Sequence, residues 1–275
     1  MAESAGAWPA ALTIAGSDSG GGAGIQADLK TFAALGAFGT SAITAITVQN
    51  TLEVRDALHL PPALVADQVR AVMDDIAPVA AKTGMLANRT IIRAVTEMLE
   101  EYRQLQVVVD PVAFTSTGYP LLEPDAMHSL QEELIPRADL ITPNLREATA
   151  LSGVEIANDD DMRRAAEVML DRGAISVLVK GGHRRDSADD LYVDGSREIW
   201  LRAKRIDTEH THGTGCSLSA AIAAGLARGL TMFDAIERAK GFVNAGLRAG
   251  YVVGGGRSPI NHFHAHQELI ERMYE

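Results

Sequence analysis

The sequence contains one cysteine and no long run of apolar residues. A single cysteine excludes an intrachain disulfide framework and a cysteine-rich zinc site, and it is typical of a reducing cytoplasm. No apolar stretch reaches the ~20 residues that a membrane span needs. Residues 1–9 also lack the basic and apolar blocks of a signal peptide. These absences predict a cytoplasmic protein with no membrane partner.

Basic residues are also scarce relative to acidic ones. The chain has 25 Lys and Arg against 36 Asp and Glu, a net charge of −11, which argues against a nucleic-acid partner. A local basic pocket for a phosphate remains compatible with this balance. With 275 residues, the chain is long enough to bury a large core in one α/β domain or two small ones.

Strand-like and helix-like segments alternate along the whole chain. No linker, repeat or charge block interrupts them, so we expect one domain over residues 1–275. Helix-length segments between the strands predict a three-layer α/β/α fold with a mostly parallel central sheet. Two small antiparallel additions are expected, at 51–60 (a strand or flap) and as a hairpin of 191–193 with 198–201. The predicted strands are 10–15, 41–48, 79–83, 107–109, 140–142 and 175–179; the predicted helices are 25–35, 61–76, 88–102, 124–134, 144–151, 159–172, 213–228 and 232–249.

Polar residues and glycines cluster where the predicted strands end. Because ligands of such folds bind beyond the carboxyl ends of the strands, these loops should converge on one site. Any one of them alone would be unremarkable. The loops are 16–24, 49–50, 83–85, 110–111, 143–144, 180–183 and 213–216.

The most informative loop is the last one, Gly213-Thr214-Gly215-Cys216, which runs into an alanine-rich helix. Glycines at a helix N-terminus let unpaired N–H groups converge on an anion, and the helix dipole favours negative charge there. The same field predicts a lowered pKa for the Cys216 thiol. The alternative is a simple helix cap followed by a buried structural cysteine.

Three other strand ends offer groups that suit phosphate chemistry. Asp110 follows a buried strand and could hold Mg²⁺, or it could merely start a surface turn. Asn144 and Glu147 could contact hydrated Mg²⁺ or a phosphate, and they also fit a capping box; both roles can coexist. Lys180 could neutralise a phosphoryl group, or it could be an exposed lysine at a turn.

Two further patterns are weaker. The glycines of 20–24 fit a dinucleotide-binding loop only loosely, since no acidic residue closes a second strand about 20 residues on, and the chain has no Walker motif. An NAD(P)-dependent oxidoreductase and a catalytically silent ligand-binding module are therefore rival functions with less support. His262, His264 and His266 have no carboxylate or thiol at metal-ligand spacing, and a surface or capping tail is expected there.

In combination, the motifs resemble those of the ribokinase-like superfamily, and within it the hydroxymethylpyrimidine/phosphomethylpyrimidine kinases of thiamine biosynthesis. The resemblance covers nearly the whole chain. The motifs that carry it are 20–31, 48–51, 82–86 (Lys-Thr-Gly-Met-Leu), 110–112, 140–144, 180–183 and 211–216.

The resemblance implies an ATP- and Mg²⁺-dependent kinase that phosphorylates a hydroxymethylpyrimidine and then its monophosphate. It implies an anion hole at Gly213, Thr214, Gly215 and Cys216, and Lys180 on the phosphates. Asp110, Asn144 and Glu147 would lie on the nucleotide side, with Asp110 and Glu147 nearest the metal. The sugar kinases of the superfamily have Asp as the catalytic base where Cys216 stands, so the cysteine points to the pyrimidine or pyridoxal branch. Cys216 would accept, or help orient, the substrate hydroxyl proton as a thiolate. The implied pyrimidine pocket comprises Gln49, Gly16, Asp28, Met85 and Val112.

Three expectations complete this interpretation. A pyridoxal or pyridoxine kinase of the same fold is the nearest alternative. The segment 51–60 is expected to close over the site, and its apolar residues, together with the resemblance, suggest a homodimer. After Val112 the chain departs from the family pattern with Ala113-Phe114 and residues 115–118, which affects one wall of the pocket.

Overall fold

The computed structural model describes residues 8–114, 121–123, 125–182 and 187–274. Within these residues, nine strands form one central sheet. Its order is β3-β2-β1-β4-β5-β6-β7-β8-β9. Strands β2, β1, β4, β5, β6 and β7 run parallel, whereas β3, β8 and β9 are joined to the sheet by antiparallel pairing. The strands are β1 (Ala10–Ser17), β2 (Phe38–Gln49), β3 (Val54–His59), β4 (Ala80–Thr83), β5 (Gln106–Val109), β6 (Leu140–Ile141), β7 (Ser176–Val179), β8 (Asp190–Asp194) and β9 (Glu198–Leu201).

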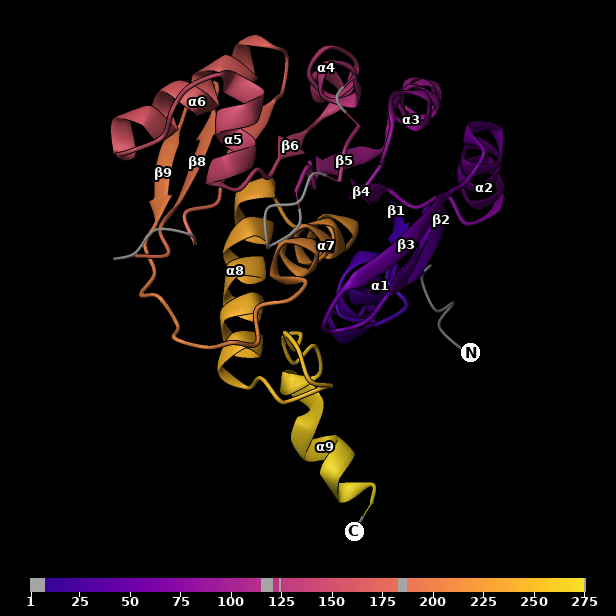
Figure 1. The fold of residues 1–275 in the computed structure, drawn as a ribbon, viewed down its shortest axis with the longest axis vertical. Coiled ribbons are helices and arrows are strands. Elements are labelled where there is room, and N and C mark those ends of the chain that lie inside the picture. Colours follow the sequence, from indigo (N-terminus) through magenta and orange to yellow (C-terminus); the bar gives the residue numbers. More distant parts are fainter. Residues whose placement is uncertain (1–7, 115–120, 124, 183–186, 275) are drawn as a thin grey trace, which may run out of the picture.

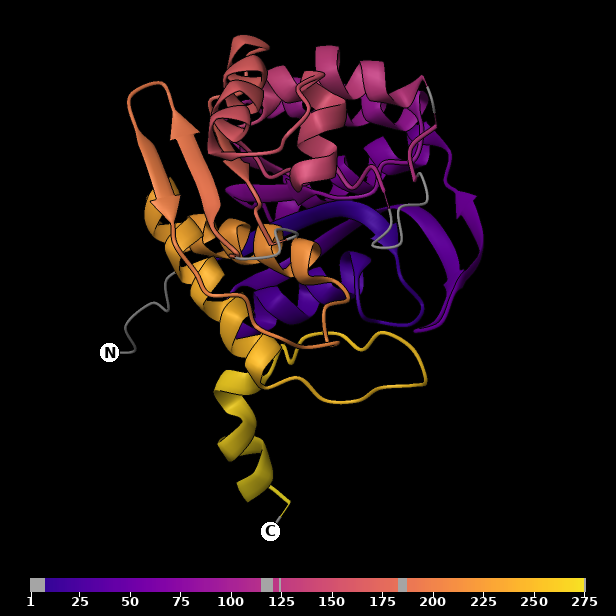
Figure 2. The ribbon, with the colours of Figure 1, turned by 60° about the vertical axis from the view of Figure 1, so that its left-hand side comes forward.

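Helices cover both faces of this sheet, which confirms the three-layer α/β prediction (Figure 1). Helices α2 to α6 pack on one face, and α1, α7 and α8 pack on the other. The short helix α9 projects away from the body in both ribbon views (Figure 2). The helices are α1 (Gly24–Ala34), α2 (Pro62–Asp75), α3 (Arg89–Glu101), α4 (Ala126–Ser129), α5 (Leu145–Ser152), α6 (Asp159–Asp171), α7 (Thr214–Ala227), α8 (Met232–Arg248) and α9 (Gln267–Arg272).

Each face of the sheet has its own apolar core. Under α2 to α6, the core includes Ile91 and Leu134, both without exposed surface. On the opposite face it is formed around α7, whose small residues bring the helix close to the strands; ten of the fourteen α7 residues are buried. A helix that is apolar all round fits only in the interior, which is why α7 lies against the sheet between α1 and α8.

Most predicted elements are present, with ends shifted by one to three residues. The segment 51–60 forms β3, an antiparallel edge strand, and the predicted hairpin is β8 and β9. The helix predicted over 124–134 is wrong in part: α4 has four residues and continues as a π-helical turn over Leu130–Leu134. No helix among the described residues is long and apolar enough to cross a membrane.

The direction in which successive strands are added to the sheet reverses at β1. The chain passes from β1 to β2 on one side and later to β4 on the other. In such sheets, ligands bind beyond the carboxyl ends of the strands at the point where the strand order reverses.

Candidate active site

The loops predicted to converge do so at one edge of the sheet, because the strands before them are parallel. Lys180, which follows β7, donates its backbone N–H to the Pro143 carbonyl after β6 at 2.8 Å. Asp110, which follows β5, donates its N–H to the Thr83 carbonyl at the end of β4 at 3.1 Å. Adjacent strand ends thus connect directly, and their side chains share one region.

The first turn of α7 lies in this region and is built to leave N–H groups free. Gly213 is the N-cap residue, with φ +72°, a left-handed conformation that favours glycine. No side chain caps the helix. The early N–H groups of a helix have no intrahelical acceptor, so those of Gly215 and Cys216 are available to an anion. The structure therefore fits the predicted anion hole.

Lys180 and Asp110 lie directly against this turn. The Lys180 ammonium is 3.0 Å from Asp110 Oδ1, and the Ser219 hydroxyl of α7 donates to Asp110 Oδ2 at 3.3 Å. A Cβ at Gly215 would lie 3.3 Å from Lys180 Nζ. The Asp110 side chain is 2% exposed and that of Lys180 14%. The alternatives of a surface turn and an exposed lysine are therefore wrong.

Asn144 and Glu147 form the predicted capping box at the start of α5. The Asn144 side chain accepts from the Glu147 N–H at 3.0 Å, and Glu147 Oε2 accepts from the Asn144 N–H at 2.9 Å. Burial raises the pKa of the Glu147 carboxyl, while the charge of Lys180 acts in the opposite direction. Glu147 is thus close enough to Lys180 and Asp110 to influence both, besides capping its helix.

Asp110 and Glu147 are also the residues suited to Mg²⁺. Among the described residues, no group of three or more His, Cys, Asp or Glu side chains is placed to hold a metal. Mg²⁺ bound with a nucleotide takes one or two carboxylates and completes its shell with water and phosphate oxygens. Two oxygen ligands beside a phosphate-binding turn fit that mode, and they do not fit an all-protein metal cage.

Cys216 differs from its prediction. It is the third residue of α7, next to the anion hole, and is half-buried. Burial raises the pKa of its thiol to about 11, although the Lys82 ammonium acts in the opposite direction. The expected lowering by the helix dipole is therefore outweighed by desolvation. With this pKa the thiol is protonated at neutral pH.

Most residues of the implied pyrimidine pocket lie at the ends of β1, β2 and β4. A Cβ at Gly16 would overlap the Met85 methyl group, so these two residues are in contact. Gln49 ends β2, and its side-chain oxygen accepts from the Thr47 hydroxyl at 3.3 Å. The buried Thr83 hydroxyl has no hydrogen-bond partner in the described part of the chain. An unpaired buried hydroxyl beside Met85 is the kind of group that a ligand or water satisfies.

Val112 and Asp28 have unusual environments. Val112 has φ +36°, which is strained for a β-branched residue, and such strain concentrates at functional sites. Asp28 is fully buried on α1: Lys82 Nζ lies 3.2 Å from its Oδ2, and the Thr13 hydroxyl donates to the same oxygen at 2.6 Å. Its carboxylate is thus already paired in the ligand-free chain.

Sequence reasoning did not assign a role to Lys82, Asp18 or His212. Lys82 is a fully buried lysine within a β-strand, a rare placement that only its motif signalled. The side chains of Asp18 and His212 are hydrogen-bonded at 3.1 Å across 194 residues. Both belong to motifs that were noted for their glycines, and nothing in a single sequence indicates that they meet.

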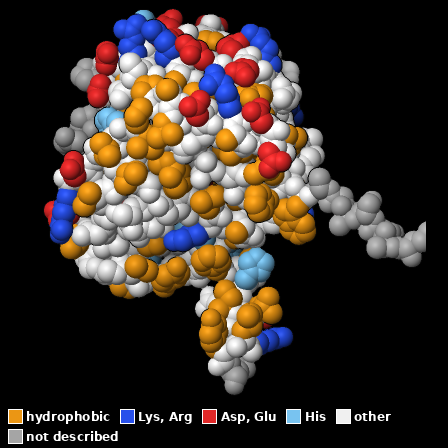
Figure 3. Space-filling view, turned by 90° about the vertical axis from the view of Figure 1, so that its right-hand side faces the viewer, with side chains coloured by type: hydrophobic (Ala, Val, Ile, Leu, Met, Phe, Trp, Pro, Cys, Tyr) orange, Lys and Arg blue, Asp and Glu red, His pale blue; other side chains and the backbone are white. Residues whose placement is uncertain are grey.

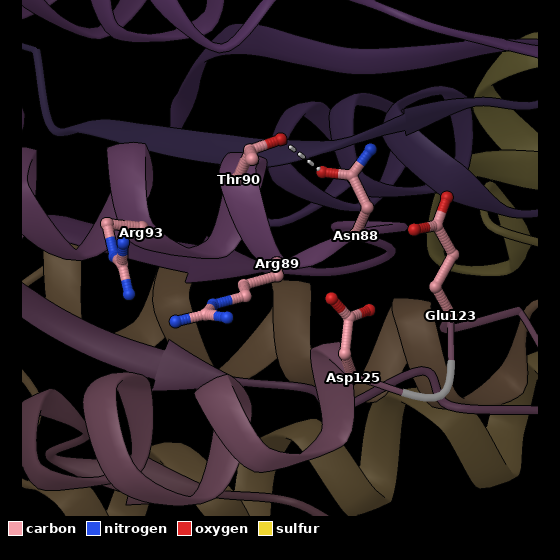
Figure 4. Close-up of a pocket in the computed structure, with 6 residues that line it drawn as sticks. All are labelled: Asn88, Arg89, Thr90, Arg93, Glu123 and Asp125. Carbon is pink, nitrogen blue, oxygen red and sulfur yellow. Dashed lines mark hydrogen bonds between the residues drawn. The ribbon is translucent and has the colours of Figure 1, made fainter.

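Several noted features lie elsewhere. Residues 115–118 of the departure after Val112, and His183, are outside the described residues. The surface tail predicted at the three histidines is wrong for His262, which is buried and lies 2.9 Å from the Ser217 hydroxyl. Figure 4 shows a separate hollow at the start of α3. It is lined by Asn88, Arg89, Thr90, Arg93, Glu123 and Asp125, none of which was predicted to act.

Comparison with known proteins agrees with this site. Residues 18–261 match the family model of phosphomethylpyrimidine kinase. The chain is 48% identical over 254 residues to the hydroxymethylpyrimidine/phosphomethylpyrimidine kinase of Streptomyces coelicolor, covering 92% of this chain and 94% of that one. It is 46% identical over 263 residues to a thiamine biosynthesis bifunctional protein of Geobacter sulfurreducens, covering 95% of this chain and 54% of that one.

Among solved structures, the chain is similar to an ADP complex of Bacillus subtilis pyridoxal kinase. The TM-score is 0.87 at 37% identity, covering 94% of this chain and 98% of that one. The likeness confirms the ribokinase-like fold, while sequence identity is higher to the pyrimidine kinases. The chain belongs to the phosphomethylpyrimidine kinase family.

Proposed function

We propose that this protein transfers the γ-phosphoryl group of ATP to the hydroxymethyl group of 4-amino-5-hydroxymethyl-2-methylpyrimidine, and then to the resulting monophosphate, in thiamine biosynthesis. The observation that carries this proposal is the uncapped first turn of α7 with Lys180, Asp110 and Cys216 against it. The names of the Streptomyces and Geobacter relatives support the substrate and the pathway.

ATP supplies the phosphoryl group, and Mg²⁺ shields its charge when bound; the ADP complex of the similar pyridoxal kinase supports nucleotide use. Asp110 and Glu147 would hold the metal, with Asn144 beside them. The backbone N–H groups of Gly215 and Cys216, presented by the Gly213-Thr214-Gly215 turn, would bind the transferring group as charge builds on its oxygens. Lys180, which pairs with Asp110, would then also neutralise negative charge on the transferring phosphate.

Cys216 is placed to orient the substrate hydroxyl. With a thiol pKa of about 11, it is a poor resting proton acceptor at neutral pH. In phosphoryl transfer the bond between the γ-phosphorus and its bridging oxygen breaks while the new O–P bond forms, ADP leaves, and the alcohol proton leaves late, to an oxygen of the transferred phosphoryl group. We therefore assign Cys216 to positioning rather than to proton abstraction.

At the other end of the substrate, Gln49 would face the edge of the aminopyrimidine, because its carboxamide both donates and accepts. Gly16, Met85, Val112 and Asp28 would complete the pocket. The glycine at 16 leaves space that the Met85 methyl group partly fills. We propose that β3, at the edge of the sheet beside Gln49, limits access of water during transfer.

The test is a coupled ADP-release assay on the full chain with the hydroxymethylpyrimidine, its monophosphate, pyridoxal and ribose. We expect the highest kcat/KM on the two pyrimidines, and loss of activity with EDTA that Mg²⁺ restores. A higher kcat/KM on pyridoxal would favour the second candidate function, that of a pyridoxal kinase. The structural similarity to Bacillus subtilis pyridoxal kinase supports this candidate. Activity on ribose alone, or on none of the four, would contradict the proposal.

The role of Cys216 is tested with two substitutions. If the thiol positions the hydroxyl, Cys216→Ala should lower kcat about 10–100-fold, and Cys216→Ser should retain most activity because its hydroxyl can make the same hydrogen bond. A base role predicts that Ser and Ala are equally poor, since a serine hydroxyl does not ionise. Steady-state kinetics at fixed pH separates these outcomes, and an Ala variant with unchanged kcat would refute both.

We further propose that residues 1–275 act as one domain in the cytoplasm and pair as a homodimer. One continuous sheet contains β1 to β9, and α7 and α8, which follow β9 in the chain, pack on that same sheet. One face of the β2–β3 ribbon presents Ile46, Val48, Val54 and Leu58, each at least 45% exposed. Figure 3 shows apolar side chains over the side of the molecule that carries these strands. A second copy would remove this surface from water.

A further inference from the structure

The proposed reaction leaves one buried carboxylate at the site without a role. Asp18 follows β1 and is 3% exposed. Its Oδ1 accepts from the Gly20 N–H at 2.8 Å, and its Oδ2 accepts from the N–H groups of Gly22 at 3.0 Å and Ala23 at 2.8 Å. One side chain thus fixes the whole glycine loop between β1 and α1.

The same carboxylate also binds His212 on the other glycine loop. His212 Nε2 lies 3.1 Å from Asp18 Oδ2. Since an ionised carboxylate only accepts, the proton of the imidazole must be on Nε2 and be donated to Asp18. On the backbone side, the His212 N–H donates to the Ser258 carbonyl at 3.2 Å. His212 is therefore held at both ends, directly before Gly213.

The two glycine loops also interlock sterically. A Cβ at Gly213 would overlap the Gly22 carbonyl oxygen, and a Cβ at Gly22 would overlap the His212 ring. There is no spare volume between the loops, so a displaced His212 ring would move both. The conformation of Gly213, and with it the direction of the N–H groups of α7, depends on this contact.

The pair extends to the end of the site where we place the pyrimidine. Gln49 Nε2 lies 3.5 Å from His212 Nε2, a packing contact rather than a hydrogen bond because both nitrogens carry hydrogen. The Ser19 hydroxyl, next to Asp18, donates to the Gln49 carbonyl at 2.7 Å and accepts from the Gln49 N–H at 2.8 Å. The loop that Asp18 organises thus contacts both the phosphate-binding turn and the substrate-recognition residue.

We propose that Asp18 and His212 are positioning residues that hold the phosphate-binding turn Gly213–Cys216 in register with the pyrimidine-binding end at Gln49. The inference rests on the proposed function for its reaction. The pair acts on the transfer step, because it sets where the N–H groups point and does not itself bind the phosphate. Loss of the pair should therefore lower kcat more than it raises KM for the pyrimidine.

The experiment compares His212→Leu, which removes the hydrogen bond, with His212→Gln, whose side-chain N–H₂ can still reach Asp18. We expect His212→Leu to lower kcat about 30-fold or more with KM changed less than about threefold, and His212→Gln to recover most of kcat. Asp18→Asn should resemble His212→Leu, and the double variant should be no worse than the singles, because both remove the same interaction. His128→Leu, on α4, controls for loss of a histidine elsewhere.

Hydrogen exchange of the peptide over 213–217 gives a readout that does not need turnover. We expect faster exchange in His212→Leu and near-normal exchange in His212→Gln. A raised KM with unchanged kcat would instead make His212 a substrate contact, and unchanged kcat and exchange would refute the proposal. A wild-type chain inactive on every substrate refutes the proposed function alone, and the exchange measurement still decides the positioning role.

Discussion

Lys82 and Asp28 are the most deeply buried charged residues near the site, and each depends on the other. Burial alone would lower the pKa of the Lys82 ammonium, but the charge of Asp28 raises this pKa, so Lys82 stays charged. Removing one partner of a buried ion pair leaves an uncompensated charge and costs about 3–5 kcal/mol. We expect Lys82→Met to lower the free energy of unfolding by about that amount, measured by urea denaturation.

The exposed ion pair of Arg55 and Glu53 provides the control for this prediction. Both side chains are more than half exposed, and such pairs contribute little. Arg55→Met should therefore leave the urea midpoint almost unchanged. Equal losses in the two variants would show that Lys82 is not the buried charge that the structure describes.

His262 supplies a residue-scale prediction on pH. Burial lowers its pKa to about 4, with the charges of Lys30 and His264 acting in the same direction. Between these two pKa values, the unfolded chain, with an ordinary histidine pKa of 6.5, binds a proton at His262 and the folded chain does not. This contribution destabilises the protein as pH falls from about 6.5 to 4, by at most about 3 kcal/mol.

The measurement compares unfolding free energies of the wild type and His262→Gln across that pH range. We expect the wild-type curve to fall relative to the His262→Gln curve as pH drops, since glutamine has no proton to bind and can still accept from the Ser217 hydroxyl. Parallel curves from pH 7 to 4 would show that His262 titrates normally in the folded chain.

At the scale of elements, the first turn of α7 depends on one glycine. Alanine at 213 would need a left-handed φ and would overlap the Gly22 carbonyl oxygen. We expect Gly213→Ala to reduce kcat about 100-fold or more by displacing the anion hole. Gly241→Ala is the matched control: Gly241 is inside α8, nothing lies within 4 Å of its added Cβ, and alanine there should be neutral or stabilising. The measurements are steady-state kinetics and a thermal melt of both variants. Equal behaviour of the two would show that Gly213 does not shape the anion hole.

The elements were predictable from sequence where local rules apply. Asn88 and Asn144 cap α3 and α5 as expected, because their side chains bond N–H groups three residues on. The π-helical turn after α4 was not predictable, since a helical pattern does not reveal a change in hydrogen-bond spacing. The pKa of Cys216 was also missed, because the dipole of a helix can be inferred locally but the burial of its first turn cannot.

At the scale of the whole molecule, the sequence indicated which loops meet but not how. Parallel strands guarantee that Asp110 and Lys180 end at one edge, so their shared site was expected. Their direct ion pair spans 70 residues, the hydrogen bond between Asp18 and His212 spans 194, and no local pattern encodes such pairings.

The proposed dimer is the remaining whole-molecule prediction. Ile46 and Leu58 are opposite each other in the β2–β3 register and are 47% and 65% exposed. If this face pairs with a second copy, sedimentation should give twice the 29.3 kDa chain mass, and Leu58→Lys should shift it to the monomer, because an ammonium buried in an apolar contact is costly. Ile175→Lys is the control, since Ile175 is equally exposed, at 65%, before β7. A monomeric wild type would contradict the proposed dimer. A dimer that survives Leu58→Lys but not Ile175→Lys would place the interface elsewhere.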